Sequence, residues 1–205
     1  TDYAELTNVV TFPAGTDTVA VVVIPWLDHR TEGDETVTLT IVTNLAYSIG
    51  SAEATVTIHD SPYAMWTISH FTLEELTDPT LSGEGADFDY DSLVNLVEYA
   101  ANRDPKAPDT NGPLVMTIEM DPTNEVQYVM LTYPRRIEPT DVAYEVAVSS
   151  DLVTWNTGTN YVEELQATPD GNNLTETVLA RLVAPFSTST NQFITVRVWL
   201  RTTRP

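Results

Sequence analysis

Apolar and polar residues alternate with a period of two over most of the first 60 residues. Three stretches carry this alternation: TVAVVVI at 18–24, ETVTLTIV at 35–42 and EATVTIH at 53–59. In the second stretch, Val37, Leu39 and Ile41 fall on one face of an extended chain, and threonines fall on the other. Such alternation predicts half-buried antiparallel strands. An acidic loop, LDHRTEGDE at 27–35, separates the first two strands.

The same alternation returns after Gly112 and Pro113. It runs through LVMTIEM at 114–120, EVQYVMLTY at 125–133, AYEVAVSS at 143–150, TETVLARLV at 175–183 and FITVRVWLR at 193–201. In the last stretch, Ile194 and Val196 face one way and Arg197 faces the other. Turn-forming sequences such as DPTN and PDGNN separate the strands. We therefore expect a small antiparallel sandwich here.

The middle of the chain has a different pattern, which favours helices. Thr72 and Glu75 have the spacing of a capping box and predict a short helix at 72–77. A second helix is predicted at 92–102. Its apolar face would be made of Leu93, Leu96, Val97 and Ala100.

These patterns divide the chain into three parts and predict a mainly β fold. Residues 1–62 and 113–205 are each expected to form a β-sandwich module, and residues 63–112 a short helix–loop–helix segment that joins them. With 205 residues and 42% apolar composition, the chain is long enough to bury a core in more than one part.

The charge of the chain limits its partners. Acidic residues outnumber basic ones by 30 to 9, which gives a formal net charge of −21. Phosphate backbones and anionic membrane surfaces repel such a chain, so we expect no nucleic-acid partner. No apolar run approaches the roughly 20 residues that span a bilayer, so we also expect no membrane insertion. The chain has no cysteine, which excludes disulfides and thiolate metal sites. Clustered carboxylates favour divalent cations, and calcium is the first candidate.

Three aspartates at alternating positions open the clearest motif, DFDYDSLVNLVE at 87–98. Oxygen-bearing side chains occupy positions 1, 3, 5, 9 and 12 of this stretch, and the backbone carbonyl at position 7 would complete the ligand set of an EF-hand. The predicted calcium ligands are Asp87, Asp89, Asp91, Leu93, Asn95 and Glu98. Like charges this close repel one another unless a dication lies between them. The alternative interpretation is a solvated acidic turn.

One position departs from the EF-hand pattern. Position 6 of the loop is normally glycine because the turn needs a positive φ, and here it is Ser92. Holding a non-glycine residue in that conformation costs on the order of 1 kcal/mol. We expect this cost to weaken the site without abolishing it. No second EF-hand is visible in the sequence, which favours a structural ion over a sensory one.

The first part of the chain resembles the second half of a Calx-beta domain. The resemblance is carried by TDY at 1–3, VTFPAGTDTVAVVVI at 10–24, DHRTEGDET at 28–36 and ATVTIHD at 54–60. It implies an immunoglobulin-like β-sandwich with calcium bound by the loops at one end. The residues that match the family's calcium positions are Asp2, Asp28, Glu32, Glu35 and Asp60. The acidic run that follows the last strand in that family is replaced by DSP at 60–62, and a solvated loop end is the alternative.

The leading strands of a Calx-beta domain have no counterpart in this sequence. A sandwich without them exposes unpaired strand edges, which favour pairing with another strand. One explanation is that the chain is a piece of a longer protein whose upstream domains supply the strands. The other is that a neighbouring copy supplies them by strand complementation, which would build filaments or larger structures.

The central segment resembles a calcium-loop segment related to dockerin and thrombospondin-type repeats, found near the C-termini of large secreted proteins of Verrucomicrobia. The resemblance rests on HFTLEEL and GADFDYDSLVNLVEYAANRDP, and it extends to a following β-sandwich through YEVAVSSDLVTWNTG and FITVRVWLR. Phe88 stands where that segment has proline, and Tyr90 and Ser92 stand where it has glycine. The resemblance spans residues 63–203 and implies an extracellular or bacterial cell-surface module without catalytic activity.

We expect the chain not to be an enzyme. Its three histidines are scattered, and it lacks HExxH, GxSxG and a cysteine nucleophile. The expected function is that of a calcium-stabilised adhesion or structural module outside the cell. The alternative is an accessory, carbohydrate-binding region of a secreted polysaccharide-degrading enzyme. In that case Trp155 and Trp199 would stack on a glycan, although aromatic residues on sandwich strands more often belong to the core.

Overall fold

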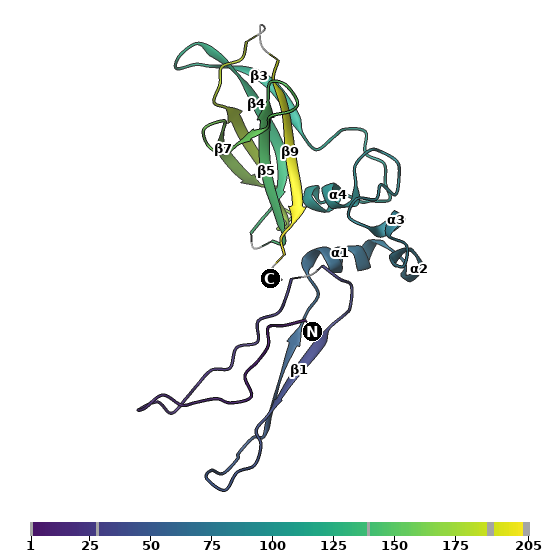
Figure 1. Ribbon diagram of the computed structural model, residues 1–205. Helices are drawn as coiled ribbons and strands as arrows, with labels where there is room; N and C mark the ends of the chain where they lie inside the picture. The colour runs from purple at the N-terminus through teal and green to yellow at the C-terminus, as the bar shows by residue number, and fades with distance from the viewer. Residues whose placement is uncertain (1, 28, 139, 188–190, 203–205) are drawn as a thin grey trace. The chain divides into compact units, whose positions relative to one another are not determined.

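A computed structural model of the chain describes residues 2–27, 29–138, 140–187 and 191–202 (Figure 1). The fold is mainly β, with antiparallel sheets, as the alternation predicted. The chain divides into two compact units, one made of the described residues up to Met65 together with Thr202, and the other of Trp66–Arg201. Among the helices in the described part of the chain, none combines the length and the apolar character needed to cross a membrane.

The first unit contains one antiparallel hairpin of strands. β1 (Glu35–Thr40) pairs with β2 (Glu53–Ile58), and Val37 lies opposite Val56. On the other face, the hydroxyl groups of Thr38 and Thr55 lie 2.9 Å apart. The alternating pattern of these two stretches is therefore confirmed as a pair of strands with an apolar and a hydroxyl face.

The prediction of a paired strand at 18–24 is wrong within the described residues. That stretch carries no strand ladder, and the unit pairs β1 with β2 alone. Next to it, Tyr3 and Pro25 form an isolated bridge. An alternating sequence specifies which side chains share a face, but it does not supply the neighbouring strand that a ladder requires.

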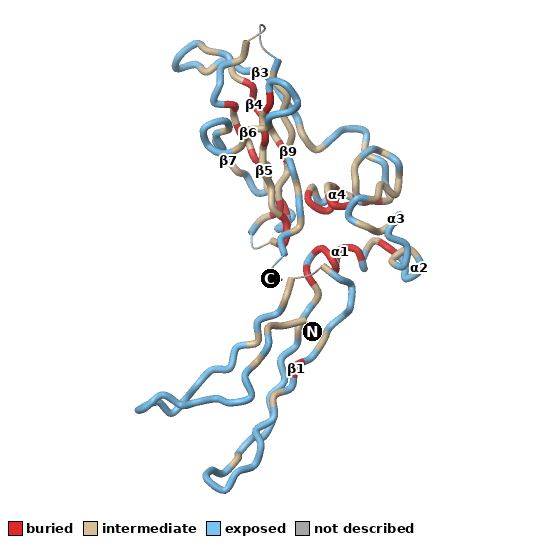
Figure 2. Tube along the Cα trace, in the orientation of Figure 1, coloured by how far each residue is buried: buried red, intermediate tan, exposed pale blue. Residues whose placement is uncertain are grey.

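Apolar side chains of the first unit lie largely in solvent. Among the described residues before Ser61, Val37 is the one buried residue, and Figure 2 shows most of this part of the chain exposed, with some intermediate stretches. The large exposed apolar residues on it are Val9, Val10, Phe12, Val19, Val21, Val22, Ile24, Ile41, Val42, Leu45, Tyr47 and Val56. Exposed apolar residues in such number commonly mark an interaction face.

The second unit contains two antiparallel sheets. The first has the order β3 (Val115–Asp121), β4 (Val126–Arg136), β8 (Thr175–Leu182), β7 (Val162–Pro169), and the second has the order β6 (Asn156–Thr157), β5 (Val142–Ser149), β9 (Phe193–Leu200). All five predicted C-terminal strands are present, and β6 and β7 are additional.

A shared core joins these two sheets. Buried side chains of β4 and β8, led by Leu131 and Val178, pack with Val146 of β5 and with Ile194 and Val196 of β9. The predicted inward face of β9 is thus correct. This arrangement, two sheets with one core between them, is compatible with a β-sandwich.

Along the chain, four short helices follow β2 and precede β3. They are α1 (Pro62–His70), α2 (Leu73–Leu76), α3 (Pro79–Ser82) and α4 (Asn95–Ala101). The predicted capping box is confirmed at α2, where the backbone N–H of Glu75 donates to Thr72 Oγ1 and the backbone N–H of Thr72 donates to Glu75 Oε2. The helices α1 and α3 were not anticipated.

The helix α4 begins at Asn95, three residues later than the predicted start at 92. Ser92 has a φ of 78°, and a residue in the left-handed region cannot belong to a right-handed helix. The helix ends at Ala101 and is followed by its C-cap, Asn102, which has a φ of 54° in the left-handed region.

Buried polar contacts fix α4 to the strands. Tyr99 is 1% exposed, and its hydroxyl group donates a 2.6 Å hydrogen bond to Asp141 Oδ1. The Arg136 guanidinium lies 3.7 Å from the centre of the Tyr99 ring, and its Nε donates to the Tyr99 carbonyl at 2.8 Å. The hydroxyl group of Tyr144 donates to the carbonyl of Ala100 at 3.0 Å. The helix is therefore attached to both β4 and β5 of its unit.

Candidate metal centre

The three aspartates of the predicted calcium loop lie together. Asp87, Asp89 and Asp91 each offer a carboxylate oxygen within 4.8 Å of the others. Hydrogen bonds within the loop hold its two ends together. The backbone N–H groups of Asp91 and Ser92 donate to the two carboxylate oxygens of Asp87 at 3.2 and 3.0 Å. The spacing of the aspartates therefore reflects a compact turn whose side chains converge.

Two loop residues adopt left-handed backbone conformations. Tyr90 has a φ of 63° and Ser92 a φ of 78°. These are the two positions at which the segment that the sequence resembles has glycine. The predicted positive φ at Ser92 is confirmed. Each such residue costs on the order of 1 kcal/mol relative to glycine, so the surrounding contacts must stabilise the turn by more than that.

Glu98 is the most unusual residue of the group. It lies on α4, it is 0% exposed, and neither of its carboxylate oxygens has a hydrogen-bond partner among the described residues. A buried carboxylate without a partner is unfavourable by several kcal/mol, about the cost of desolvating one ion. It must therefore be neutralised by a proton or by a cation.

The environment of Glu98 favours its neutral form when no cation is bound. Burial, followed by the negative charges of Asp89, Asp91, Asp109 and Asp87, raises the pKa of Glu98 to about 7. A carboxyl group with such a pKa takes up a proton close to neutral pH unless a positive charge is supplied.

Asp109 belongs to the same group, although the sequence did not reveal it. One oxygen each of Asp91, Glu98 and Asp109 lies within 4.8 Å of the others. The backbone N–H of Asp109 donates to Asp91 Oδ2 at 2.7 Å, which holds Asp109 beside the loop. In a chain with 30 acidic residues, an aspartate outside the motif carries no spacing signal.

Asn95, at position 9 of the loop, is fully buried and anchors the turn before it. Its side-chain amide donates to the carbonyls of Leu81 and Gly83, both at 2.9 Å. Its Oδ1 atom is buried and has no hydrogen-bond partner among the described residues. Leu93 lies in the loop with its N–H donated to Asp91 Oδ1 at 2.7 Å, and metal binding by its carbonyl stays a prediction.

No protein-family model matches the chain, and no curated protein or solved structure matches it. The resemblances to Calx-beta domains and to calcium-loop segments therefore stay predictions from the residues quoted for them. All the groups that converge on the site are oxygen donors, which suit hard cations and not soft ones.

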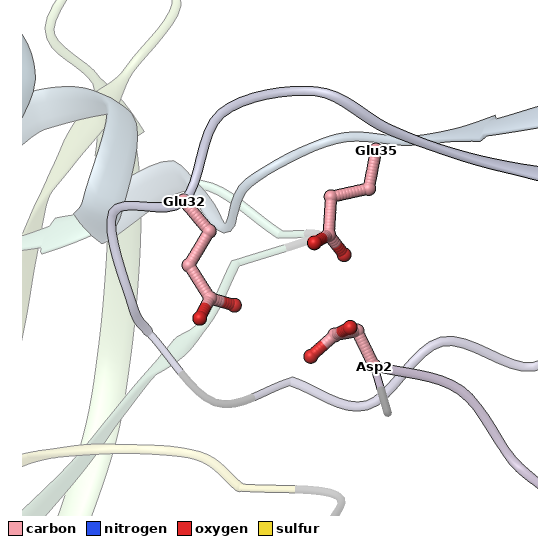
Figure 3. A group of neighbouring side chains, drawn as sticks. All are labelled: Asp2, Glu32 and Glu35. Atoms are coloured by element: carbon pink, nitrogen blue, oxygen red, sulfur yellow. The ribbon is translucent and has the colours of Figure 1, made fainter.

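A second acidic group lies in the first unit. Asp2, Glu32 and Glu35 each offer an oxygen within 4.8 Å of the others, and Figure 3 shows their carboxylates turned toward one another. They line an open pocket of about 300 Å³. A hydrogen bond with Asp2, followed by burial, raises the pKa of Glu35. The calcium site that the sequence predicts at these residues stays a prediction.

Asp60, a further predicted ligand of this second group, is not among the three residues that come together. Asp60 uses its carboxylate to accept the backbone N–H groups of Glu32 and Gly33, at 3.4 and 3.1 Å. Asp60 lines the same pocket, but its carboxylate oxygens accept hydrogen bonds from the backbone of the acidic loop. Asp28 lies outside the described residues.

The two candidate stacking tryptophans lie near one strand of the second unit. Trp199 is on β9 and is 44% exposed, so it is not a core residue. Trp155 precedes β6 and is half-buried, and its ring centre lies 5.7 Å from the guanidinium of Arg197, also on β9. Arg197 and Trp199 share the outward face of that strand.

Proposed function

We propose that this chain is a non-catalytic, calcium-stabilised structural module that acts outside the cell or at the cell surface. The observation that carries the proposal is the buried carboxylate of Glu98, which has two unpartnered oxygens and lies beside the carboxylates of Asp91 and Asp109. A bound dication would supply both the charge and the coordination that these oxygens lack.

The composition of the group favours calcium over other cations. Five carboxylates, those of Asp87, Asp89, Asp91, Glu98 and Asp109, lie in two overlapping acidic groups that share Asp91. Calcium accepts six to eight oxygen ligands in a flexible arrangement, whereas magnesium requires near-octahedral geometry and keeps several waters. Zinc prefers nitrogen and sulfur ligands, which the group does not offer.

The ion would stabilise the second unit through α4. Glu98 would bind the ion from the same helix turn in which Tyr99 is hydrogen-bonded to Asp141. An ion shared by the loop and α4 would therefore join residues 87–91 to a helix that is already attached to the strands. A site of this kind suits extracellular calcium concentrations, which match dissociation constants of about 10⁻⁴ to 10⁻³ M.

Thermal unfolding of the purified chain tests this proposal. Calcium at about 100 times its dissociation constant adds roughly 2.7 kcal/mol to the free energy of unfolding. For a domain of this size, that corresponds to a rise in Tm of roughly 5 to 10 °C over the value in EDTA. Sodium chloride at matched ionic strength is the control. A Tm that is the same in EDTA and in calcium, with no heat of binding in calorimetry, would rule out the structural ion.

The exposed apolar residues of the first unit support an assembly role within this proposal. A β1–β2 hairpin with a single buried apolar residue has no second layer among the described residues of its unit. A strand donated by a neighbouring copy, or by upstream domains of the same protein, would cover it and build a filament or a larger structure. Filaments in electron micrographs of the purified chain would support donation between copies, and uniform small particles at high concentration would contradict it.

The exposure of Trp199 supports a second candidate function, an accessory region that binds carbohydrate. The exposed indole of Trp199 shares the outward face of β9 with Arg197, whose guanidinium lies 5.7 Å from the centre of the Trp155 ring, and an exposed indole offers a surface on which a sugar ring can stack. Binding on a glycan array that is lost in Trp199→Ala, and kept in a variant of the exposed residue Tyr161, would favour this function.

A further inference from the structure

Asp109 lies outside the twelve-residue loop, yet it is held at the candidate metal centre. Its backbone N–H donates to Asp91 Oδ2 at 2.7 Å, and its carboxylate lies with those of Asp91 and Glu98. It comes from the polar turn that follows α4, so the group draws its oxygens from both ends of the segment 87–109.

A basic side chain, that of Arg103, lies next to the carboxylate of Asp109. Arg103 NH1 lies 2.6 Å from Asp109 Oδ2, and both side chains are mostly buried. The directed hydrogen bond of that nitrogen goes elsewhere, to the carbonyl of Asn111 at 2.7 Å. Asp109 Oδ2 is a buried oxygen without a hydrogen bond among the described residues, and its contact with Arg103 is an ion pair.

Arg103 is the one basic side chain that forms an ion pair with any of the five carboxylates in the described part of the chain. The positive charge of Arg103 neutralises the Asp109 carboxylate, whereas a metal ion would neutralise the whole group. A guanidinium and a dication that share one carboxylate repel each other, because two positive charges a few ångströms apart interact unfavourably in a partly buried site.

We propose that Asp109 is a further ligand of the calcium ion and that Arg103 is a built-in competitor, which neutralises Asp109 in the metal-free protein and is displaced from it when the ion binds. This inference rests on the proposed function. If Asp109 binds the ion, the ion also stabilises the segment that follows α4. If Arg103 competes with the ion, the affinity for calcium is lower than the five carboxylates alone would give. An arginine that merely positioned Asp109 as a ligand would raise the affinity instead, so the two roles differ in sign.

Calcium titration calorimetry of the full chain tests both parts. Asp109→Asn is expected to weaken calcium binding at least tenfold, and Arg103→Met to strengthen it about two- to fivefold, the range that a partly exposed ion pair provides. In an Asp109→Asn background, Arg103→Met should change the affinity little, because Arg103 acts through Asp109. Asp104→Asn and Arg197→Met are matched controls, since each makes the same charge change away from the group.

The possible outcomes separate this inference from the proposed function. A wild-type chain that binds no calcium rejects both. Calcium binding that is lost in Glu98→Gln but unchanged in Asp109→Asn rejects the role of Asp109 alone. Weaker binding in Arg103→Met, with Arg103→Lys close to wild type, rejects the competitor role. Far-UV circular dichroism checks that each variant folds, and if Asp109→Asn does not fold, the sign of the Arg103→Met effect decides.

Discussion

Glu98 and Tyr99 are consecutive residues of α4 whose side chains contact two different parts of the second unit. The Glu98 carboxylate lies with Asp91 and Asp109, whereas the Tyr99 hydroxyl donates to Asp141, directly before β5. One helix turn therefore connects the acidic group with the sheets. We expect events at the acidic group to change the stability of the whole unit and not only of the loop.

Tyr99→Phe tests this connection. The variant removes the hydrogen bond to Asp141, which is 3% exposed, and should lower the free energy of unfolding by about 1 to 3 kcal/mol. Urea denaturation in EDTA and in calcium measures the loss, and calorimetry should show weaker calcium binding. Tyr161→Phe changes an exposed tyrosine and is the matched control. Equal calcium affinity in Tyr99→Phe and wild type would show that the docking of α4 and the ion are independent.

Glu98→Gln is expected to have opposite effects with and without calcium. In EDTA at pH 8 the variant should be at least as stable as wild type, because it removes a buried, unpartnered negative charge beside four other carboxylates. In calcium it should be less stable, because the ion loses a ligand. Paired melts in the two buffers measure the difference, with the exposed Glu119→Gln as the control. A variant that is less stable than wild type by the same amount in both buffers would contradict the metal site.

The metal-free protein should also lose stability as the pH rises. The pKa of Glu98 is raised to about 7 in the folded chain from its ordinary 4.5, so the folded state holds a proton that the unfolded state has released in this range. The contribution of Glu98 is therefore fully present below pH 4.5 and falls between pH 4.5 and 7, by about 3 kcal/mol in total. Urea denaturation in EDTA at several pH values measures it as the difference between wild type and Glu98→Gln. A difference that does not change with pH would contradict the raised pKa.

Much of the fold could be predicted from the sequence because its strands alternate cleanly. β1, β2 and the five C-terminal strands place apolar residues at every second position, and that is what a period of two records. β7 was missed because its sequence, VEELQATP, does not alternate, and its pairing with β8 shifts register between Glu164 and Gln166. The start of α1 did carry a signal: Pro62 is its first residue, and Ser61 Oγ accepts the backbone N–H of Ala64.

Only those members of the acidic group that are close together in the sequence could be predicted from it. The spacing of Asp87, Asp89 and Asp91 within one turn brought the three carboxylates together as expected. Asp109 enters through tertiary structure, by a backbone hydrogen bond to Asp91, and no local pattern encodes it. The same limit explains the stretch at 18–24, whose alternation is clear but whose partner strand is not specified by its own residues.

Ser92→Gly is expected to stabilise the loop. Ser92 has a φ of 78°, and replacing it with glycine should raise the free energy of unfolding by about 1 kcal/mol and tighten calcium binding. Its backbone N–H to Asp87 Oδ2 is kept. Ser92→Ala is the matched control, since it removes the hydroxyl group and keeps the strained Cβ. If alanine stabilises the chain as much as glycine does, the hydroxyl group and not the backbone conformation is the cause.

The exposed apolar face of the first unit gives the last prediction. Val56 lies opposite Val37 on that face and is 44% exposed, whereas Thr57 points to the other face of the same strand. Val56→Lys should reduce self-association of the chain, because a charge on the apolar face prevents a donated strand from covering it. Thr57→Lys adds the same charge on the opposite face and should leave self-association unchanged. Sedimentation velocity at increasing protein concentration measures both variants, and the Tm shift caused by calcium in the second unit should be the same in each. If the two variants reduce association equally, net charge and not the apolar face controls assembly, and strand donation would no longer explain it.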